Sequence, residues 1–421
     1  MASRWLPEQT ARYLRGAGPV ALGQAVGALA VLLLGVATAR HLGPDGRGVF
    51  ATTTFAAVLA GSGSLSIVPT VAYFDPKRLG VLAAIGAGIG LVGGAGAGAF
   101  LFLTDSPGSA GIAPFIPGLY ALFVTPIALA SGRFLGAGST RSLGLLFGLG
   151  PLAQLGGVLV AMAIGADGAG GLLIGWTGGF AALALVVAVR IPRSGSILPS
   201  SGQLVRYSLA AASTNVLWAL GARVELFVLA GLATAGEVGV YSVALAPAQV
   251  LTVLASAYAA AIYPALRGGG RAILSDALDH ARRLAGLALL VAGVFAVALP
   301  TLIPLVYGDA FDSSVGPGLI LLGAGVVLAP VAVLNAYLNN ALGRPGLTSA
   351  LAGAGLAVTI VLAVLLVPSS GAEGAASASL VGSLTLVGAG GLIVRSARAA
   401  ATQGDQDQDY ARNAEYGRPQ P

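Results

Sequence analysis

The sequence predicts an all-α protein that crosses a membrane about twelve times. Of its 421 residues, 56% are hydrophobic and only 9% are charged, whereas about a quarter of the residues of a soluble domain are charged. The apolar runs are about 20 residues long, which is the length a helix needs to cross a bilayer. They lack the alternation of a β-barrel strand. Because the backbone in lipid must form its hydrogen bonds within each segment, we expect every run to be a helix.

The spans follow one another with short polar connections. They are expected at about residues 19–38, 49–72, 79–103, 114–131, 142–165, 170–189, 208–266 (two spans), 284–306, 315–335, 347–367 and 374–394. A short interfacial helix is expected within 267–283, where apolar residues share one face. The first run, with its basic arm and its Ala37-Thr38-Ala39 ending, also fits a secretory signal peptide. Another apolar run follows within a dozen residues, so a first span is the preferred interpretation.

The basic residues predict the orientation. Of the 22 lysines and arginines, Arg40 and Arg47 fall in an outer loop, Arg223 falls inside a span, and all others fall on one side. Lysine and arginine concentrate in the cytoplasmic loops of membrane proteins. The sequence therefore predicts a multi-pass protein of the cytoplasmic (inner) membrane with both termini in the cytoplasm. Acidic residues mark the outer loops: Asp45, Asp105, Asp167, Glu237, Asp309, Asp312 and Glu373.

A weak internal repeat divides the chain into two halves. Gly48, Val49 and Phe50 match Gly239, Val240 and Tyr241 at an offset of 191, and the same offset places Gln24 on Asn215. Six spans that repeat in the same orientation imply two parallel lobes around a central cavity. The predicted units are an N-lobe at 1–207, a C-lobe at 208–398, and a polar tail at 399–421 whose composition favours disorder.

The candidate site residues are polar side chains inside spans. Arg223 and Glu225 share one span, and a charge at the bilayer centre costs roughly 3 kcal/mol. Arg223 could bind a phosphate bidentately or extend to the outer interface. Two positions along a helix place Glu225 about 200° from Arg223, so one is expected to face the cavity and the other a neighbouring helix. Asn215 and Gln24 could contact substrate, or they could hydrogen-bond between helices.

Several local motifs resemble a known family. The segment 40–51 (RHLGPDGRGVFA), the segment 237–244 (EVGVYSVA), Gly308-Asp309-Ala310-Phe311 and Gly343-Arg344-Pro345 resemble the polysaccharide and O-antigen flippases of the multidrug/oligosaccharidyl-lipid/polysaccharide (MOP) exporter superfamily. The resemblance covers nearly the whole chain up to Arg398. It implies a flippase that moves a lipid-linked oligosaccharide across the membrane by alternating access, in contact with the bilayer and with possible glycan-assembly enzymes as partners.

Two other function classes remain open. A small-molecule exporter on the same fold would need a carboxylate in its cavity for cation coupling, and only Glu225 could supply it. A membrane-embedded polymerase or glycosyltransferase would need a catalytic loop, and every predicted loop is short. We therefore expect no enzyme activity and no catalytic residue. The chain has no cysteine and two histidines, so neither a metal site nor a cofactor is expected, and its basic residues follow membrane topology rather than nucleic-acid binding.

Overall fold

The computed structural model describes residues 6–74, 76–77, 79–104, 111–191, 200–266, 274–340 and 345–416. Every regular element in these ranges is a helix. Nine of the described helices are long and apolar enough to cross a membrane, and the bent pair α7–α8 makes a tenth candidate. The prediction of an all-α membrane protein is confirmed, while the number of twelve spans stays a prediction.

Two helices are long enough to cross the membrane twice. Helix α1 (Leu6–Ser64) folds back at Gly43, and α12 (Pro345–Tyr416) folds back at Gly371. Both glycines have a positive φ, 65° and 51° respectively, a backbone conformation that side chains with a Cβ rarely adopt. Pro44 and Ala372 follow directly. The expected loops between spans one and two and between spans eleven and twelve are therefore sharp turns rather than extended connections.

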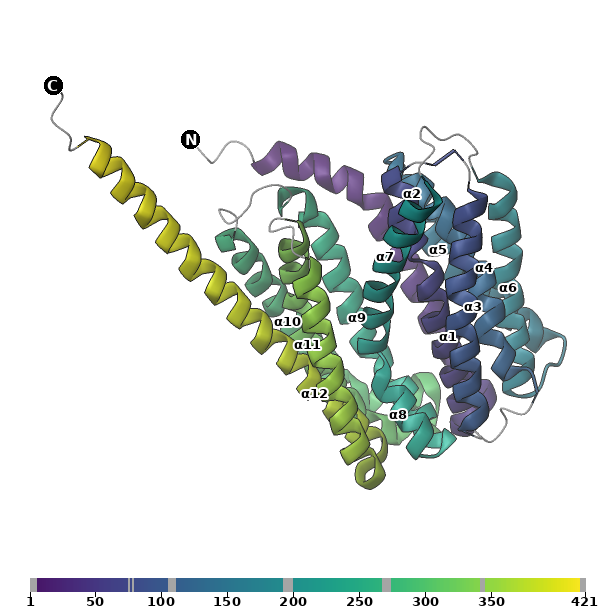
Figure 1. Ribbon diagram of the computed structural model, residues 1–421. Helices are drawn as coiled ribbons and strands as arrows, with labels where there is room; N and C mark the ends of the chain where they lie inside the picture. Colours follow the sequence, from purple (N-terminus) through teal and green to yellow (C-terminus); the bar gives the residue numbers. More distant parts are fainter. Residues whose placement is uncertain are drawn as a thin grey trace.

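The remaining helices complete the bundle in chain order. They are α2 (Ile67–Phe74), α3 (Gly80–Leu103), η1 (Ala113–Phe115), α4 (Ile116–Gly136), α5 (Thr140–Ala163), α6 (Gly168–Arg190), α7 (Ser201–Gly221), α8 (Val224–Leu232), α9 (Ala235–Leu266), α10 (Leu274–Tyr307), η3 (Asp309–Ser314) and α11 (Val315–Asn340). The start of α1 and the end of α12 lie at the same end of the molecule (Figure 1). That placement requires an even number of crossings.

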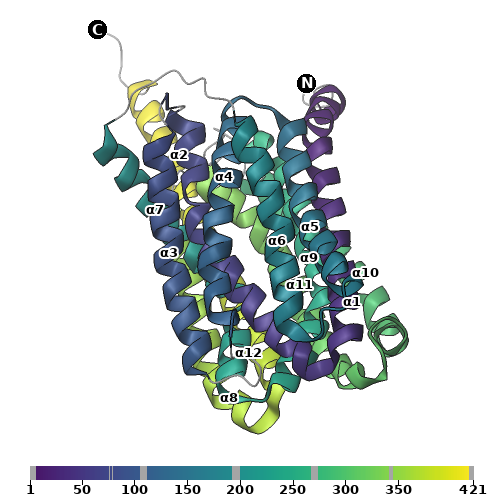
Figure 2. The ribbon, with the colours of Figure 1, turned by 90° about the vertical axis from the view of Figure 1, so that its right-hand side faces the viewer.

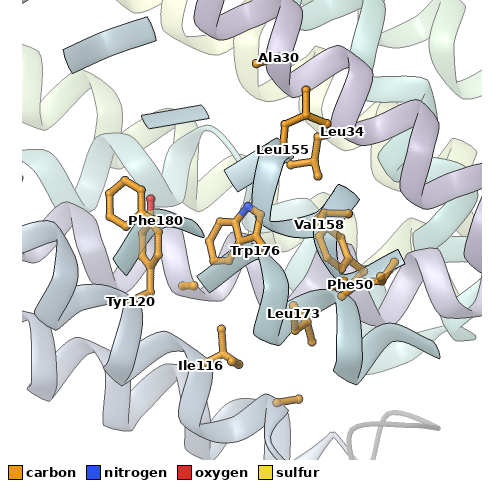
Figure 3. Packing of buried hydrophobic residues seen from close by; sticks show 14 of the residues in the cluster. Ala30, Leu34, Phe50, Ile116, Tyr120, Leu155, Val158, Leu173, Trp176 and Phe180 are labelled. Atoms are coloured by element: carbon orange, nitrogen blue, oxygen red, sulfur yellow. The ribbon is translucent and has the colours of Figure 1, made fainter. Parts of the chain in front are cut away.

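Each half of the chain has its own buried core. Residues of α1, α4, α5 and α6 form one cluster, with Tyr120 stacked on both Trp176 and Phe180 (Figure 3). The corresponding clusters of the second half join α8, α9 and α12, and α9, α10 and α11. Figure 1 shows α3 to α6 on one side of the molecule and α10 to α12 on the other, and in Figure 2 the first group faces the viewer. The structure thus has two helical lobes.

The lobes meet where the predicted repeat places equivalent residues. A Cβ at Gly48 would overlap the carbonyl oxygen of Ala235, and a Cβ at Gly239 would overlap that of Pro44. Pro44 and Ala235 are also separated by the repeat offset of 191. Such a reciprocal contact is what a two-fold relation between the lobes predicts. We call this contact, formed by Pro44, Gly48, Ala235 and Gly239, the outer closure, because the distribution of basic residues predicts that this end of the bundle faces the outside.

Hydrogen bonds also stabilise the end of the bundle at which the outer closure lies. His41 Nε2 lies 3.3 Å from the carbonyl oxygen of Ala166, and the backbone N–H of Ala372 donates to Glu237 at 2.9 Å. Each bond lies within one lobe. It joins the first turn of that lobe at this end to the last one, so the two bonds are equivalent. Arg40 joins the lobes directly, because its Nε donates to the carbonyl oxygen of Val306 (2.7 Å) at the carboxyl end of α10. A cation there also faces the negative end of the helix dipole.

The lobes touch again at the end where the termini lie. Thr70 of α2 and Ser208 of α7 share a buried hydrogen bond of 2.9 Å. The ring of Tyr207 stacks on that of Tyr73, with ring centres 5.6 Å apart, and meets Phe74 edge-on. This contact holds α2 against α7.

One expectation about a helix end is wrong. The interfacial helix expected at 267–283 is, from Leu274 on, the start of α10, which continues unbroken to Tyr307. Helix α12 extends to Tyr416, and the disorder expected of the polar tail from residue 399 stays a prediction. Helix α7 begins at Ser201, so the predicted lobe boundary at residue 207 falls within its first turns. That boundary itself stays a prediction.

The close approach of the helices in the outer closure predicts that a side chain at position 48 destabilises the protein. Gly48→Ala forces a methyl group into the backbone of α9, and overpacking of this kind costs about 1–3 kcal/mol. We expect a lower apparent melting temperature in detergent. Gly96→Ala is the matched control, because a Cβ there meets no atom within 4 Å. Equal melting temperatures for both variants would contradict the close approach of α1 and α9.

Candidate functional site

A cavity of about 650 Å³ lies between the lobes, lined by α1, α5, α6, α9 and the end of α10. It extends along α1 from Gln24 to Gly35, which is roughly 16 Å of helix. The outer closure seals the end near Gly35. Leu29 and Leu32 line the cavity and are also exposed, so the cavity is open along this edge of α1. Its polar lining consists of Gln24, Arg47, Thr54, Gln154, Ser242, Gln249, Thr252, Ser256 and Tyr307.

Arg47 is the one charged residue among those that line this central cavity. Its Nη1 donates to Thr38 Oγ1 (2.6 Å), its Nε donates to Ser242 Oγ (3.1 Å), and its guanidinium lies 5.7 Å from the ring centre of Phe50. The sequence placed Arg47 in an outer loop, which is wrong. The turn at Gly43 ends the loop within about one residue, so that Arg47 already belongs to the second arm of α1 and faces inward.

Three glutamines give the cavity wall its neutral polar character. Gln24 of α1 lines the cavity, together with Gln154 of α5 and Gln249 of α9. Gln154 is buried and its Nε2 donates to the hydroxyl of Tyr120 at 3.3 Å. Tyr120 stacks on Trp176, which also lines the cavity (Figure 3). The aromatic stack thereby fixes the position of one wall amide.

A second cavity, of about 400 Å³, lies within the C-lobe and contains the two charged residues that the sequence singled out. Its walls include Arg223 and Glu225, together with Gln249, which lines both cavities. Hydroxyl groups of Thr359, Ser379 and Ser383 also line it. The C-lobe cavity is therefore polar on several sides.

Arg223 lies at a break in its span. Helix α7 ends at Gly221, α8 begins at Val224, and the two helices are bent by 57°. The guanidinium donates to the carbonyl oxygen of Ala222 and lies 5.5 Å from the ring centre of Phe55, which belongs to α1 and lines the central cavity. Arg223 thus satisfies a carbonyl group that the break exposes, and it reaches toward the N-lobe.

The expectation that Arg223 and Glu225 face opposite sides of one regular helix is wrong. Because the helix breaks between Gly221 and Val224, both side chains line the C-lobe cavity. Glu225 is buried, and one carboxylate oxygen accepts a hydrogen bond from Tyr241 Oη at 2.9 Å. The other oxygen is buried with no hydrogen-bond partner among the described residues.

The structure does not bring all four predicted residues together. Gln24 lines the central cavity, Arg223 and Glu225 line the C-lobe cavity, and Asn215 lies on α7 outside the described walls of both. Sequence reasoning missed Arg47, Ser242 and Tyr307 as wall residues of one cavity. The repeat could have indicated Arg47, because it precedes Gly48, the residue that meets α9. Within the described residues no cluster of His, Asp and Glu side chains could hold a metal ion.

Comparison with known proteins places this geometry on a known architecture. No protein-family model and no curated protein sequence matches the chain. Several solved structures match it, at low sequence identity. An inward-facing multidrug resistance MATE family transporter of the MOP superfamily superposes with a TM-score of 0.65 and 13% identity, covering 90% of this chain and 96% of that one. The lipid II flippase MurJ, in an inward closed conformation, gives a TM-score of 0.69 and 12% identity over 89% of this chain and 86% of that one.

The chain has the fold of the MOP-superfamily transporters. An outward-facing MATE structure matches as well, with a TM-score of 0.60 and 16% identity over 94% of this chain and 97% of that one. The MOP fold predicted from the local motifs is confirmed. At these identities the comparison establishes the architecture, and the substrate has to be argued from the cavity walls.

The contact between Tyr241 and Glu225 predicts a coupled effect on stability. Tyr241→Phe removes the hydroxyl that donates to the buried carboxylate, and an unsatisfied buried group of this kind costs about 1–3 kcal/mol. Adding Glu225→Gln should recover part of that loss, because a neutral amide is cheaper to bury. Thermal unfolding of the two single variants and the double variant measures the coupling. Additive losses would contradict a direct interaction between the two side chains.

Proposed function

We propose that this protein is a flippase that moves a lipid-linked oligosaccharide across the cytoplasmic membrane by alternating access. The observation that carries the proposal is the lining of the central cavity. Its polar groups are amides and hydroxyls, its one charged residue is Arg47, and no carboxylate is among the described wall residues. Amides and hydroxyls both donate and accept hydrogen bonds, as the hydroxyl groups of a sugar require.

The single cation suits the linkage of such a substrate. A guanidinium presents donors in a planar fork that matches a phosphate group. Arg47 lies at the sealed end of the cavity, so that the phosphate end of a lipid-linked glycan could reach it while the sugars contact Gln24, Gln154 and Gln249. Arg223 offers a second guanidinium at the boundary between the two cavities.

The open edge of the cavity supports a lipid-linked substrate. Leu29 and Leu32 on α1 are exposed at that edge, where apolar side chains contact lipid rather than water. A polar headgroup can then lie inside while its lipid tail remains in the bilayer. The distribution of basic residues predicts that both termini lie in the cytoplasm, and the resemblance to the flippases implies transport from the inner to the outer leaflet. Glycan-assembly enzymes would supply the substrate and are its expected partners.

One observation favours a second candidate, a small-molecule exporter of the drug type. Glu225 is a buried carboxylate in the C-lobe cavity with one oxygen that has no partner, and a cation-coupled exporter needs such a group. The carboxylate lies outside the walls of the central cavity, where a drug would bind, and Tyr241 already engages its other oxygen. The lining of the central cavity therefore favours the flippase.

Deletion of the gene tests the proposal. We expect lipid-linked oligosaccharide to accumulate in the inner leaflet and surface polysaccharide to fall, while assembly of the glycan on its lipid continues. An impermeant periodate or lectin label measures how much headgroup reaches the outer leaflet. Complementation with Arg223→Lys should restore only part of the labelling, because a point charge cannot reproduce bidentate binding.

Complementation with Ser213→Ala controls for expression and membrane insertion. Ser213 is exposed on α7, and its hydroxyl bonds only within its own helix, to Ala210. If deletion leaves both outer-leaflet labelling and surface glycan unchanged, the flippase proposal is wrong and small-molecule export becomes the leading candidate.

A further inference from the structure

The guanidinium of Arg47 is shared between the two lobes at the sealed end of the central cavity. It donates to Thr38 within α1 and to Ser242 on α9. The hydroxyl of Ser242 in turn donates to the carbonyl oxygen of Gly239 at 2.8 Å. Gly239 is the residue of α9 that packs against Pro44 in the outer closure. Two successive hydrogen bonds therefore connect the one cation of the cavity wall to the contact that seals it.

Two more donors, Arg47 Nη2 and the Tyr307 hydroxyl, lie at the sealed end of the cavity. An ideal Cβ on Gly35 would lie 3.8 Å from Arg47 Nη2 and 4.0 Å from the hydroxyl oxygen of Tyr307. Gly35 has no side chain, and no other atom of the described residues outside its own helix backbone lies within 4 Å of that position. The Tyr307 hydroxyl is buried and has no hydrogen-bond partner among the described residues. Arg47 comes from the N-lobe and Tyr307 from the C-lobe, and both line the cavity.

We propose that Arg47 and Tyr307 bind a phosphate group of the substrate, and that this phosphate takes the guanidinium from Ser242 and thereby loosens the outer closure. The identity of the ligand, the pyrophosphate headgroup of a polyprenyl lipid, rests on the proposed function. The site and its connection to the closure rest on the contacts above. The bound substrate would thus open its own path to the other side.

Relative bond strength supports the exchange. A hydrogen bond between a guanidinium and a phosphate is roughly twice as strong as one to a neutral hydroxyl, so an anion competes well with Ser242 for Arg47. A ligand shifts a conformational equilibrium only through its different affinity for the two states. Here the difference arises because the Arg47–Ser242 bond exists when the outer side is closed and is replaced when phosphate is bound.

The test measures the distance between the outer ends of the lobes. The chain has no cysteine, so Asp45→Cys and Asp312→Cys, both at exposed positions, allow spin labels to be attached to the full-length protein in nanodiscs. Electron–electron resonance then gives the fraction of molecules with a longer distance. Polyprenyl pyrophosphate, inorganic pyrophosphate and a phosphate-free glycolipid are added in separate samples.

We expect polyprenyl pyrophosphate to at least double the fraction of molecules with the longer distance, and the phosphate-free glycolipid to leave it unchanged. Ser242→Ala should raise this fraction without ligand and still bind the lipid pyrophosphate. Arg47→Gln should abolish the response, and Arg47→Lys and Tyr307→Phe should weaken binding of the lipid about tenfold. Ser213→Ala is the control and should respond as the parent protein does.

An unchanged distance distribution in Ser242→Ala, or a normal response in Arg47→Gln, would overturn the proposal. A response to inorganic pyrophosphate and none to polyprenyl pyrophosphate would overturn the lipid headgroup as the ligand. The flippase proposal is tested separately. If Arg47→Gln keeps a normal response while deletion of the gene still abolishes glycan export, the link between phosphate and closure is wrong and the flippase proposal stands. If the purified protein responds normally but deletion of its gene leaves glycan export unchanged, the flippase proposal is wrong and the link between phosphate and closure stands.

Discussion

The close contact between Gly48 and Gly239 is the constraint on which the architecture depends. Each glycine lets the backbone of its helix touch the other lobe at the residue four positions before its counterpart, so the two contacts are equivalent and reciprocal. This contact seals the cavity at one end. It also places Arg47, one residue before Gly48, at the floor of the cavity and within reach of Ser242. A side chain at either glycine would separate the helices and move the cation out of position.

The cavity walls follow from how polar groups are kept inside an apolar bundle. A buried polar side chain is expensive unless it is bonded, and most of those described here are bonded: Gln154 to Tyr120, Arg47 to Thr38 and Ser242, Glu225 to Tyr241. Exceptions among the described residues are the hydroxyls of Ser66, Thr177 and Tyr307 and one oxygen of Glu225. Tyr307 belongs to the wall of the central cavity and Glu225 to the wall of the C-lobe cavity, so two of these four groups lie beside a cavity.

Much of this architecture could be predicted from the sequence, because hydropathy and the repeat at offset 191 act over whole helices. Gly48 and Gly239, which that offset aligns, lie in the contact between the lobes, but the sequence did not predict this contact. Local backbone geometry was not predictable. Nothing in the apolar run around Arg223 indicated a break of 57°, and it is the break that brings Arg223 and Glu225 into one cavity. Arg47 was assigned to a loop because the rule for basic residues considers only spans and loops, whereas the turn at Gly43 shortens that loop to almost nothing.

The proposed alternating access requires the outer closure to open in every transport cycle, and a reversible crosslink across it tests this requirement most directly. An ideal Cβ on Gly236 would lie 2.8 Å from the Asp45 carboxylate, so Asp45→Cys and Gly236→Cys in the cysteine-free chain are placed to form a disulfide across the two lobes. The measurement is headgroup flipping in proteoliposomes before and after reduction, with each single cysteine variant as a control. The account predicts that flipping stops when the bond forms and returns when it is reduced. Full flipping by the crosslinked protein would contradict it.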